Sequence, residues 1–290
     1  MTVTATRVEL LAIVLLIATG LLGGHTRAQE PPRQVTSSFD AGWLKAVVSI
    51  EQLATDQAVR PIGTGFLVLS PYKHIVLVTA RHVVVDRAQR LKAGLLIRLN
   101  EASGQSDLIG EAELTGLGLG GWFISSDADV ACRFILRRHA SDLLLIPLAQ
   151  FLPTDHLKAG APAVVIGFPL GLRSERYATP ILKRASVALV AGSEVLLDVS
   201  VFPGNSGGPA VYVPTVPLGE GLTSPMLNEQ RLIGLVSEAI AYQEVAVSEQ
   251  TTRPRITFEQ NAGLSRVVSA DAITKLLHRD DVRKLDESLK

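Results

Sequence analysis

The stretch Gly204-Asn205-Ser206-Gly207-Gly208-Pro209 follows an apolar run and places one serine among three glycines. A serine hydroxyl becomes a good nucleophile only beside a base, and the oxyanion that it generates needs hydrogen-bond donors. Glycine lets the chain turn tightly, so that backbone N–H groups can point at such an oxyanion. The stretch therefore predicts acyl-transfer chemistry at Ser206.

The order of the histidines along the chain separates two folds that could carry this stretch. In the α/β-hydrolases, whose nucleophile turn reads G-x-S-x-G, the catalytic histidine follows the serine. The only histidine after Ser206 is His278, which lies in an amphipathic terminal segment and is expected to be structural. Pro209 also stands where the helix of an α/β-hydrolase would begin. Both observations weaken the alternative of an esterase of that class.

A better candidate base, His82, lies upstream of the serine. It comes three residues after the apolar run Val76–Thr79, and a histidine held on a rigid element suits a general base. By itself His82 could equally be a buried core histidine. Asp129 stands immediately before another apolar run, so its side chain can reach inward and orient the base. Asp127 is expected to stay in the turn.

Short runs rich in valine, isoleucine, leucine and phenylalanine recur along the chain, separated by glycine, proline and polar turns. A polar connector, Pro153 to Pro162, divides them into two groups. Many short strands without intervening helices predict a sandwich or barrels, here two β-barrel halves. Gln243 to Gln260 is expected to be a surface loop. The predicted strands are Ala46–Ile50, Gly65–Leu69, Ile75–Thr79, Leu95–Leu99, Glu111–Leu114, Val130–Leu136, Leu143–Ile146, Ala163–Gly167, Ile181–Val190, Val195–Val199, Ala210–Val213, Leu232–Ser237 and Leu264–Val268.

Composition excludes several classes of function. Lys+Arg and Asp+Glu are 28 each, so bulk charge gives no support for binding nucleic acid. Cys132 is the only cysteine, which rules out an intrachain disulfide, and it lies in a strand-like run where a buried, unreactive thiol is expected. The histidines show no metal-ligand spacing, so neither a metal nor another cofactor is predicted.

The N-terminus differs from the rest of the chain. Arg7 precedes a run from Leu10 to Leu22 that is apolar except for Thr19 and Gly20, which is short for a membrane span and typical of a signal peptide. Residues 1–28 are therefore predicted to be a signal peptide cleaved after Ala28, or else an uncleaved N-terminal anchor, and 29–40 a tether. Either alternative predicts an exported protein, periplasmic or extracellular, whose contact with a membrane is limited to that anchor.

Taken together, Thr79-Ala80-Arg81-His82, Asp129-Val130-Ala131 and Gly204 to Pro209 resemble the three active-site motifs of the trypsin-like serine proteases. The order His, Asp, Ser is that of the chymotrypsin fold. The resemblance implies an all-β fold of two six-stranded antiparallel β-barrels with a C-terminal helix. The protease domain would span 41–290, with one barrel at about 41–152, the other at about 160–268, and the helix at 269–278.

Within that superfamily the chain looks most similar to the bacterial HtrA/Deg-like proteases. Asp198 with Pro203-Gly204-Asn205-Ser206 resembles their D-x-x-x-x-P-G-N-S segment, and Ile166-Gly167-Phe168-Pro169 with Gly171-Leu172 resembles their G-x-P-x-G-L turn. No PDZ domain is expected after the terminal helix, so the oligomeric state stays open. Asn205 cannot form the ion pair that activates trypsin zymogens, which implies that no proteolytic activation is needed.

The resemblance implies a role for each residue. Ser206 is the nucleophile, His82 the general base and then acid, and Asp129 the group that orients His82. The oxyanion hole consists of the N–H groups of Gly204 and Ser206. The substrate pocket is formed by Ser200, Val201, Phe202, Ser237, Glu238, Ala239 and Gly263, where Glu238 could instead set the shape of the pocket.

These roles imply an exported serine endopeptidase that acts on proteins or peptides, in protein quality control outside the cytoplasm. Because the pocket lacks an acidic residue at the position that makes trypsin prefer Lys or Arg, small or medium apolar side chains are the expected substrates. The alternative, from another class, is a catalytically quiet trypsin-fold module that binds peptides or proteins.

Overall fold

The computed structural model describes residues 39–174, 176–214, 229–247 and 254–289, and all of them belong to one compact unit, Ser38–Lys290. The predicted signal peptide or anchor, 1–28, and most of the tether, 29–40, lie outside the described residues. None of the described helices has the length and apolar character needed to span a membrane.

An open antiparallel sheet forms the first half of this unit. Its strands run in the order β5-β4-β1-β2-β3-β7-β6, and β8 pairs in parallel with β2. Valine, isoleucine and leucine fill the buried positions of β1 to β3, where β-branched side chains fit a pleated surface well. The strands are β1 (Val47–Leu53), β2 (Val59–Leu69), β3 (Ile75–Thr79), β4 (Leu95–Asn100), β5 (Ser106–Gly110), β6 (Phe123–Ile124), β7 (Ala131–Phe134) and β8 (Ile146–Pro147).

This sheet corrects the prediction of a closed six-stranded barrel for the first half. The chain leaves β5 directly into helix α3 (Glu111–Gly116), and β6 has two residues that pair with β7 alone, so the edge strands β5 and β6 do not meet. The strand predicted at Glu111–Leu114 is therefore wrong. Glu111 and Glu113 stand in the first helical turn, where negative charge is favourable, and Leu114 is fully buried.

The second half is a closed barrel of six strands, in the order β10-β11-β14-β13-β12-β9. Every neighbouring pair among these strands is antiparallel. This part of the fold agrees with the predicted six-stranded barrel. The strands are β9 (Pro162–Gly167), β10 (Ile181–Ala191), β11 (Glu194–Asp198), β12 (Pro209–Tyr212), β13 (Arg231–Val247) and β14 (Pro254–Ser269).

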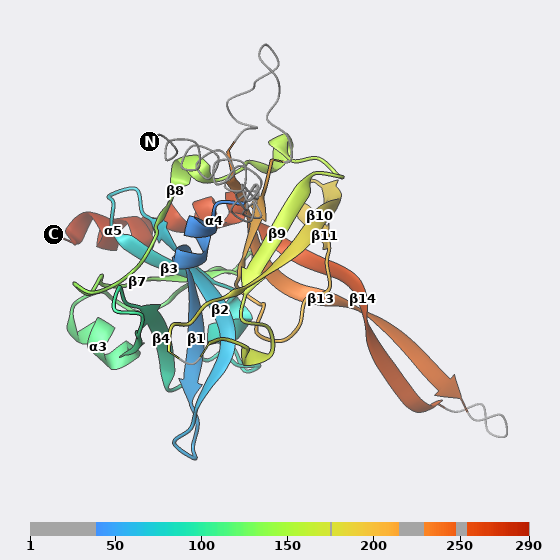
Figure 1. Ribbon diagram of the computed structural model, residues 1–290, viewed down its shortest axis with the longest axis horizontal. Helices are drawn as coiled ribbons and strands as arrows, with labels where there is room; N and C mark the ends of the chain where they lie inside the picture. Colours follow the sequence, from blue (N-terminus) through green and yellow to red (C-terminus); the bar gives the residue numbers. More distant parts are fainter. Residues whose placement is uncertain (1–38, 175, 215–228, 248–253, 290) are drawn as a thin grey trace, which may run out of the picture. The chain divides into compact units, whose positions relative to one another are not determined.

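Strands β13 and β14 are much longer than the barrel requires, at 17 and 16 residues. Their pairing continues to Val247↔Pro254, so the segment Gln243 to Gln260, predicted to be a loop, is strand over all of its described length. Figure 1 shows the two strands continuing beyond the barrel as a separate ribbon. The ribbon passes through register shifts at Val236/Glu238 and Ala239/Ala241, which bend and re-aim it.

One hydrophobic cluster crosses from the first half to the second. It contains Phe66 and Leu77 of the open sheet together with Ile166 and Phe168 of the barrel side, all fully buried. Burying such a side chain stabilises the fold by roughly 1.5–3 kcal/mol. A second cluster fills the barrel interior. Because the halves share a core, loops at their junction are held in a fixed relation.

Two helices close the chain, α4 (Ala270–Leu277) and α5 (Asp280–Ser288). The Ser269 hydroxyl accepts a hydrogen bond from Ala272 N at 3.3 Å and so caps α4, whose buried face packs into the shared cluster. The sequence did not predict α5. Its buried Asp286 accepts hydrogen bonds from Ser70 Oγ at 2.7 Å and His74 Nδ1 at 2.8 Å in the first half. The remaining helices are α2 (Arg81–Val84) and the short 3₁₀ helices η1 (Ala41–Ala46), η2 (Leu148–Gln150), η3 (Thr154–His156) and η4 (Pro169–Gly171).

Candidate active site

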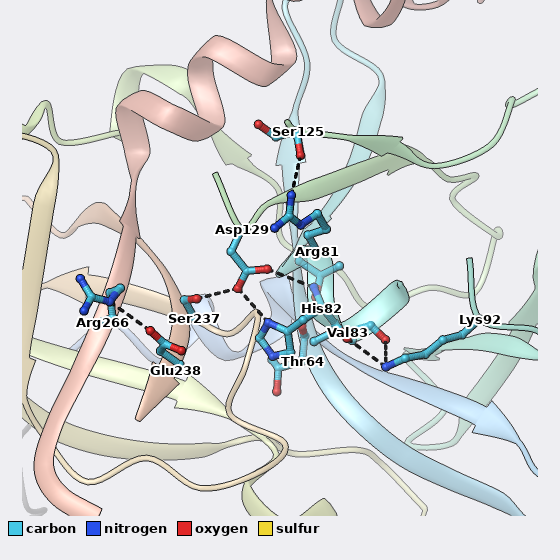
Figure 2. Close-up of polar contacts among 11 residues, drawn as sticks. Thr64, Arg81, His82, Val83, Lys92, Ser125, Asp129, Ser237, Glu238 and Arg266 are labelled. Atoms are coloured by element: carbon cyan, nitrogen blue, oxygen red, sulfur yellow. Dashed lines mark hydrogen bonds and ion pairs between the residues drawn. The ribbon is translucent and has the colours of Figure 1, made fainter. Parts of the chain in front are cut away.

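His82 and Asp129 form a two-point contact in the first half of the chain. His82 lies in the single turn α2, directly after the buried strand β3, and Asp129 lies in the tight turn between β6 and β7. One Asp129 oxygen accepts a hydrogen bond from the His82 backbone N–H at 3.0 Å, and the other lies 2.8 Å from His82 Nδ1 (Figure 2). Because an ionised carboxylate can only accept, Nδ1 carries the proton and Nε2 keeps a lone pair for a substrate proton.

Ser237 is a third member of this cluster. Its hydroxyl donates a hydrogen bond to Asp129 Oδ2 at 2.6 Å. Ser237 as a whole is only 6 % exposed, so the hydroxyl lies against the carboxylate and away from solvent. Burial by itself would raise the pKa of Asp129, but the hydrogen bonds from His82 and Ser237 outweigh it and lower that pKa to about 2. Asp129 therefore stays ionised at neutral pH and holds His82 in one orientation.

Two other residues from the sequence argument lie where they were expected. Asp127 stays in the exposed turn, where it pairs with Lys275 of α4 at 2.5 Å. The ring of His278 binds the Thr274 carbonyl of its own helix at 2.9 Å, a bond that caps the end of α4. Neither side chain is available for the chemistry at Ser206.

Ser206 lies at the junction of the two halves. Its carbonyl accepts a hydrogen bond from Thr64 N of β2 at 2.9 Å. The next residue, Gly207, has φ +84°, and a Cβ there would lie 2.1 Å from Thr64 O and 2.9 Å from Ala80 N, two residues before His82. Glycine is therefore required for the serine loop to approach the histidine turn. Within the described residues no hydrogen bond joins the Ser206 hydroxyl to His82, a contact that is often loose in the absence of substrate.

The turn before Ser206 fixes the direction of one candidate oxyanion donor. Asn205 N donates to Phe202 O at 2.9 Å across Pro203 and Gly204, and Gly204 has φ +97°, as in a type II turn with proline second and glycine third. The Pro203 carbonyl accepts from Leu170 N at 2.6 Å. Since a trans peptide points its C=O and N–H in opposite directions, the Gly204 N–H faces away from Leu170.

The second candidate donor is arranged in the same manner. The Asn205 carbonyl accepts from Gly208 N at 2.9 Å, so the Ser206 N–H points in the opposite direction. Within the described part of the chain, neither this N–H nor that of Gly204 donates a hydrogen bond. Two neighbouring N–H groups without partners are what an oxyanion requires.

Thr64 and Leu170 hold the serine turn of the candidate site, and the sequence did not single them out. Thr64 is fully buried, and its hydroxyl bridges the Gly204 carbonyl and Phe168 N, at 2.6 and 3.0 Å. Leu170 holds the Pro203 carbonyl from a left-handed conformation, φ +55°, that is strained for leucine. One sequence signal marked each residue. Thr64 stands between two glycines, and Leu170 stands between a proline and a glycine.

The predicted pocket residues fall into three places. Ser200, Val201 and Phe202 lead into the serine loop: Val201 is buried and its carbonyl accepts from Asn261 Nδ2 at 2.6 Å, whereas Phe202 is 44 % exposed. Lys183 of β10, which the sequence did not single out, binds the Ser200 carbonyl and lies 4.8 Å from the Phe202 ring centre. Burial lowers the pKa of this lysine.

The remaining pocket residues lie on β13 and β14. Ser237 turns its hydroxyl to Asp129, and Glu238 and Ala239 follow it in exposed positions on β13. Glu238 forms an ion pair with Arg266 of β14 at 3.1 Å, so its carboxylate points toward the neighbouring strand (Figure 2). Gly263 of β14 has φ +80° and open space where a Cβ would stand.

Asn205 is a buried turn residue. Its Oδ1 accepts a hydrogen bond from Phe202 N at 3.0 Å, which closes the serine turn from the inside. An amide in this place needs no charged partner.

Comparison with known proteins shows the fold and the family of this chain. The human heparin binding protein has a similar structure, with a TM-score of 0.51 and 13% identity over 87% of this chain and 96% of that one. At that identity the likeness shows the fold alone. No curated protein matches the chain. The sequence profile of a family described as "Trypsin-like peptidase domain" matches residues 63–213, just over half of the chain and a span that includes His82, Asp129 and Ser206. The chain belongs to this family of trypsin-like peptidase domains.

Proposed function

We propose that the protein is a serine endopeptidase that hydrolyses peptide bonds through an acyl-enzyme formed on Ser206. One observation carries the proposal: the His82–Asp129 pair and a serine turn with two unpartnered N–H groups are built on the same junction of the fold. A base alone, or a donor pair alone, would support a binding site as readily as an enzyme.

The chemistry assigns one task to each group. Ser206 Oγ attacks the scissile carbonyl while His82 Nε2 takes its proton, and the N–H groups of Gly204 and Ser206 bind the oxyanion. His82 then gives the proton to the leaving amine as the C–N bond breaks. A water molecule, deprotonated by the same nitrogen, attacks the acyl group and restores the serine. Asp129 stabilises the protonated imidazole throughout.

The environment of Phe202 and Val201 supports a preference for small or medium apolar side chains before the scissile bond. Neither of these residues nor Ser200 brings a carboxylate to the pocket wall. A role outside the cytoplasm, a kinship with the HtrA/Deg-like proteases and the absence of a cofactor are parts of the same proposal. They rest on the motifs and on the leader-like N-terminus of the sequence.

A catalytically quiet peptide-binding module is the second candidate. The observation that favours it is that, within the described residues, no hydrogen bond joins Ser206 to His82. Casein digestion by the full chain, run beside Ser206→Ala, separates the two candidates. The endopeptidase proposal predicts digestion that the variant loses. Digestion that survives in Ser206→Ala would assign the activity elsewhere, and no digestion by folded wild type would favour the binding module.

A further inference from the structure

Among the described residues, the ribbon formed by β13 and β14 leaves one long edge of β13 without a partner strand. Strand β12 pairs with β13 only from Arg231 to Leu235, and the Gly207–Gly208 segment bonds Val236. Beyond that point no described strand pairs with this edge, while β14 accompanies the other edge as far as Val247. An unpaired edge presents a row of free N–H and C=O groups, which is a template for another extended chain.

This free edge begins at the candidate active site. Ser237, the first residue after the Val236 contact, bonds Asp129, and the exposed Glu238 and Ala239 follow on the same strand. The register shift at Val236/Glu238 turns the strand at this point. A chain that pairs with β13 would therefore run from the candidate site out along the ribbon.

The ribbon also carries exposed aromatic side chains on one face. Tyr242 is 57 % exposed and Phe258 49 %. Tyr242 pairs with Gln260, and Phe258 pairs with Glu244, so the two aromatic residues share a face on diagonal positions. Large apolar side chains gathered on a projecting element mark an interaction surface. A two-stranded ribbon is also only marginally stable by itself, and a third strand would complete it.

We propose that the outer part of this ribbon, beyond Ala239, is a further binding site for an unfolded polypeptide substrate, which adds to the free edge of β13 as a third strand and places an apolar side chain against Tyr242. The proposal rests on the proposed endopeptidase function and names its substrate class. Strand addition supplies affinity through backbone hydrogen bonds, and the side chains that alternate along the new strand supply selectivity.

The chemistry of the site decides which part of the substrate lies on the ribbon. His82 protonates the leaving amine, so the part C-terminal to the scissile bond lies toward the first half of the protein. The acyl part stays on Ser206, in the second half, from which β13 departs. The N-terminal part of the substrate therefore follows β13.

The length of the ribbon sets the position of the apolar residue and the conformation of the substrate. Ser237 and Tyr242 are separated by a distance of about 17 Å along a strand, so the apolar residue lies about six positions before the scissile bond. A folded protein rarely offers that much extended chain with its edge free. An unfolded protein does, and one that exposes apolar residues fits the aromatic face.

The test compares two fluorogenic peptides with the same four residues before the scissile bond. The short peptide has no further residues on its N-terminal side. The long peptide has about ten residues before the scissile bond, with a leucine about six positions before that bond. The full chain should cleave the long peptide with a kcat/KM at least about tenfold higher. The double variant Tyr242→Ser/Phe258→Ser should lose that advantage and cleave the short peptide as wild type does. Leu117→Ser, an equally exposed apolar residue on the first half, is the matched control and should keep it.

The backbone contribution is measured with the same long peptide carrying N-methyl groups beyond the fourth position. Methylation removes N–H donors without changing the side chains, and it should abolish the advantage as well. Equal cleavage of long and short peptides by wild type overturns the proposal, as does an advantage that survives the double variant. An advantage that tolerates N-methylation also overturns it, since no strand is then added.

Binding to Ser206→Ala separates this inference from the proposed function. Fluorescence anisotropy should show that Ser206→Ala binds the long peptide more tightly than the short one. Adding Tyr242→Ser/Phe258→Ser to Ser206→Ala should remove this difference in affinity. If binding shows this pattern while wild type cleaves nothing, the endopeptidase function fails and the ribbon site stands. If the ribbon instead pairs with a second copy of the chain, sedimentation will show a dimer that the double variant dissociates with no change in peptide binding, and the proposal is overturned.

Discussion

The hydroxyl of Thr64 donates a hydrogen bond of 2.6 Å to the carbonyl of Gly204, from a strand 140 residues earlier in the chain. The same oxygen accepts from Phe168 N at 3.0 Å. One fully buried side chain of the first half therefore holds two loops of the second half, through the Gly204 carbonyl of the serine turn and Phe168 N of the loop after β9. The candidate oxyanion site is thus held by contacts from both halves.

Thr64→Val should lower kcat by about 10- to 100-fold with a smaller change in KM, because the Gly204 peptide loses the bond that holds its orientation. It should also cost about 1–3 kcal/mol of folding free energy, since buried polar groups lose their partner. Steady-state kinetics and urea unfolding measure the two effects. Thr64→Ser keeps the hydroxyl and should retain most of the activity. A fully active Thr64→Val would show that Thr64 only stabilises the fold.

Asp129→Asn should lower kcat by about 10⁴-fold while leaving the fold intact. An amide in this place donates to Nδ1 and so shifts the imidazole proton to Nε2, where it blocks uptake of the Ser206 proton. Single-turnover acylation with a nitrophenyl ester measures the step directly. Asp127→Asn is the matched control in the same turn and should acylate at the wild-type rate. An Asp129→Asn protein that acylates as fast as wild type would assign the orienting role to another group.

The low pKa of Asp129, about 2, predicts how stability depends on pH. The folded state favours the ionised carboxylate, so Asp129 stabilises the protein at any pH above its unfolded pKa of about 4. That contribution is lost as the pH falls from about 4 to about 2. Urea unfolding at a series of pH values should therefore show a steeper fall in the free energy of unfolding for wild type than for Asp129→Asn. Parallel curves would contradict the assigned contacts.

The buried thiol of Cys132 should be unreactive in the folded protein. Burial raises its pKa to about 12, so almost no thiolate exists at neutral pH, and the side chain is fully covered. Iodoacetamide should leave native protein unmodified and add one label after denaturation, as read by intact mass. Rapid labelling of native protein would show that β7 opens readily.

The sequence singled out the parts of the candidate site that are local in the chain. His82, Asp129 and Ser206 each follow or precede an apolar run, so their motifs could be recognised without knowing how the halves pack. The closed second barrel was predictable for the same reason, since its strands alternate with clear turn residues. Ser269 as the cap of α4 is another local signal, visible in one turn of sequence.

The rest depends on long-range contacts. No residue near Thr64 in the sequence indicates its hydrogen bond to Gly204. The sequence of α5 likewise does not indicate that Asp286 is buried and binds Ser70. The polar composition from Gln243 to Gln260 read as a loop because a ribbon exposed on both faces lacks the alternation of a half-buried strand. Helix α3 was missed because one buried leucine, Leu114, gives no helical period.

Labelling with a fluorophosphonate probe tests most directly the claim that Ser206 is an activated nucleophile. The probe reacts with a serine that a neighbouring base activates and that has hydrogen-bond donors for the oxyanion beside it. The full chain and Ser206→Ala are each incubated with the probe and read by intact mass and peptide mapping, with circular dichroism to verify folding. The account predicts one adduct per chain, on Ser206, and none in Ser206→Ala. A folded wild-type protein that stays unlabelled, or an adduct that persists in Ser206→Ala, would contradict it.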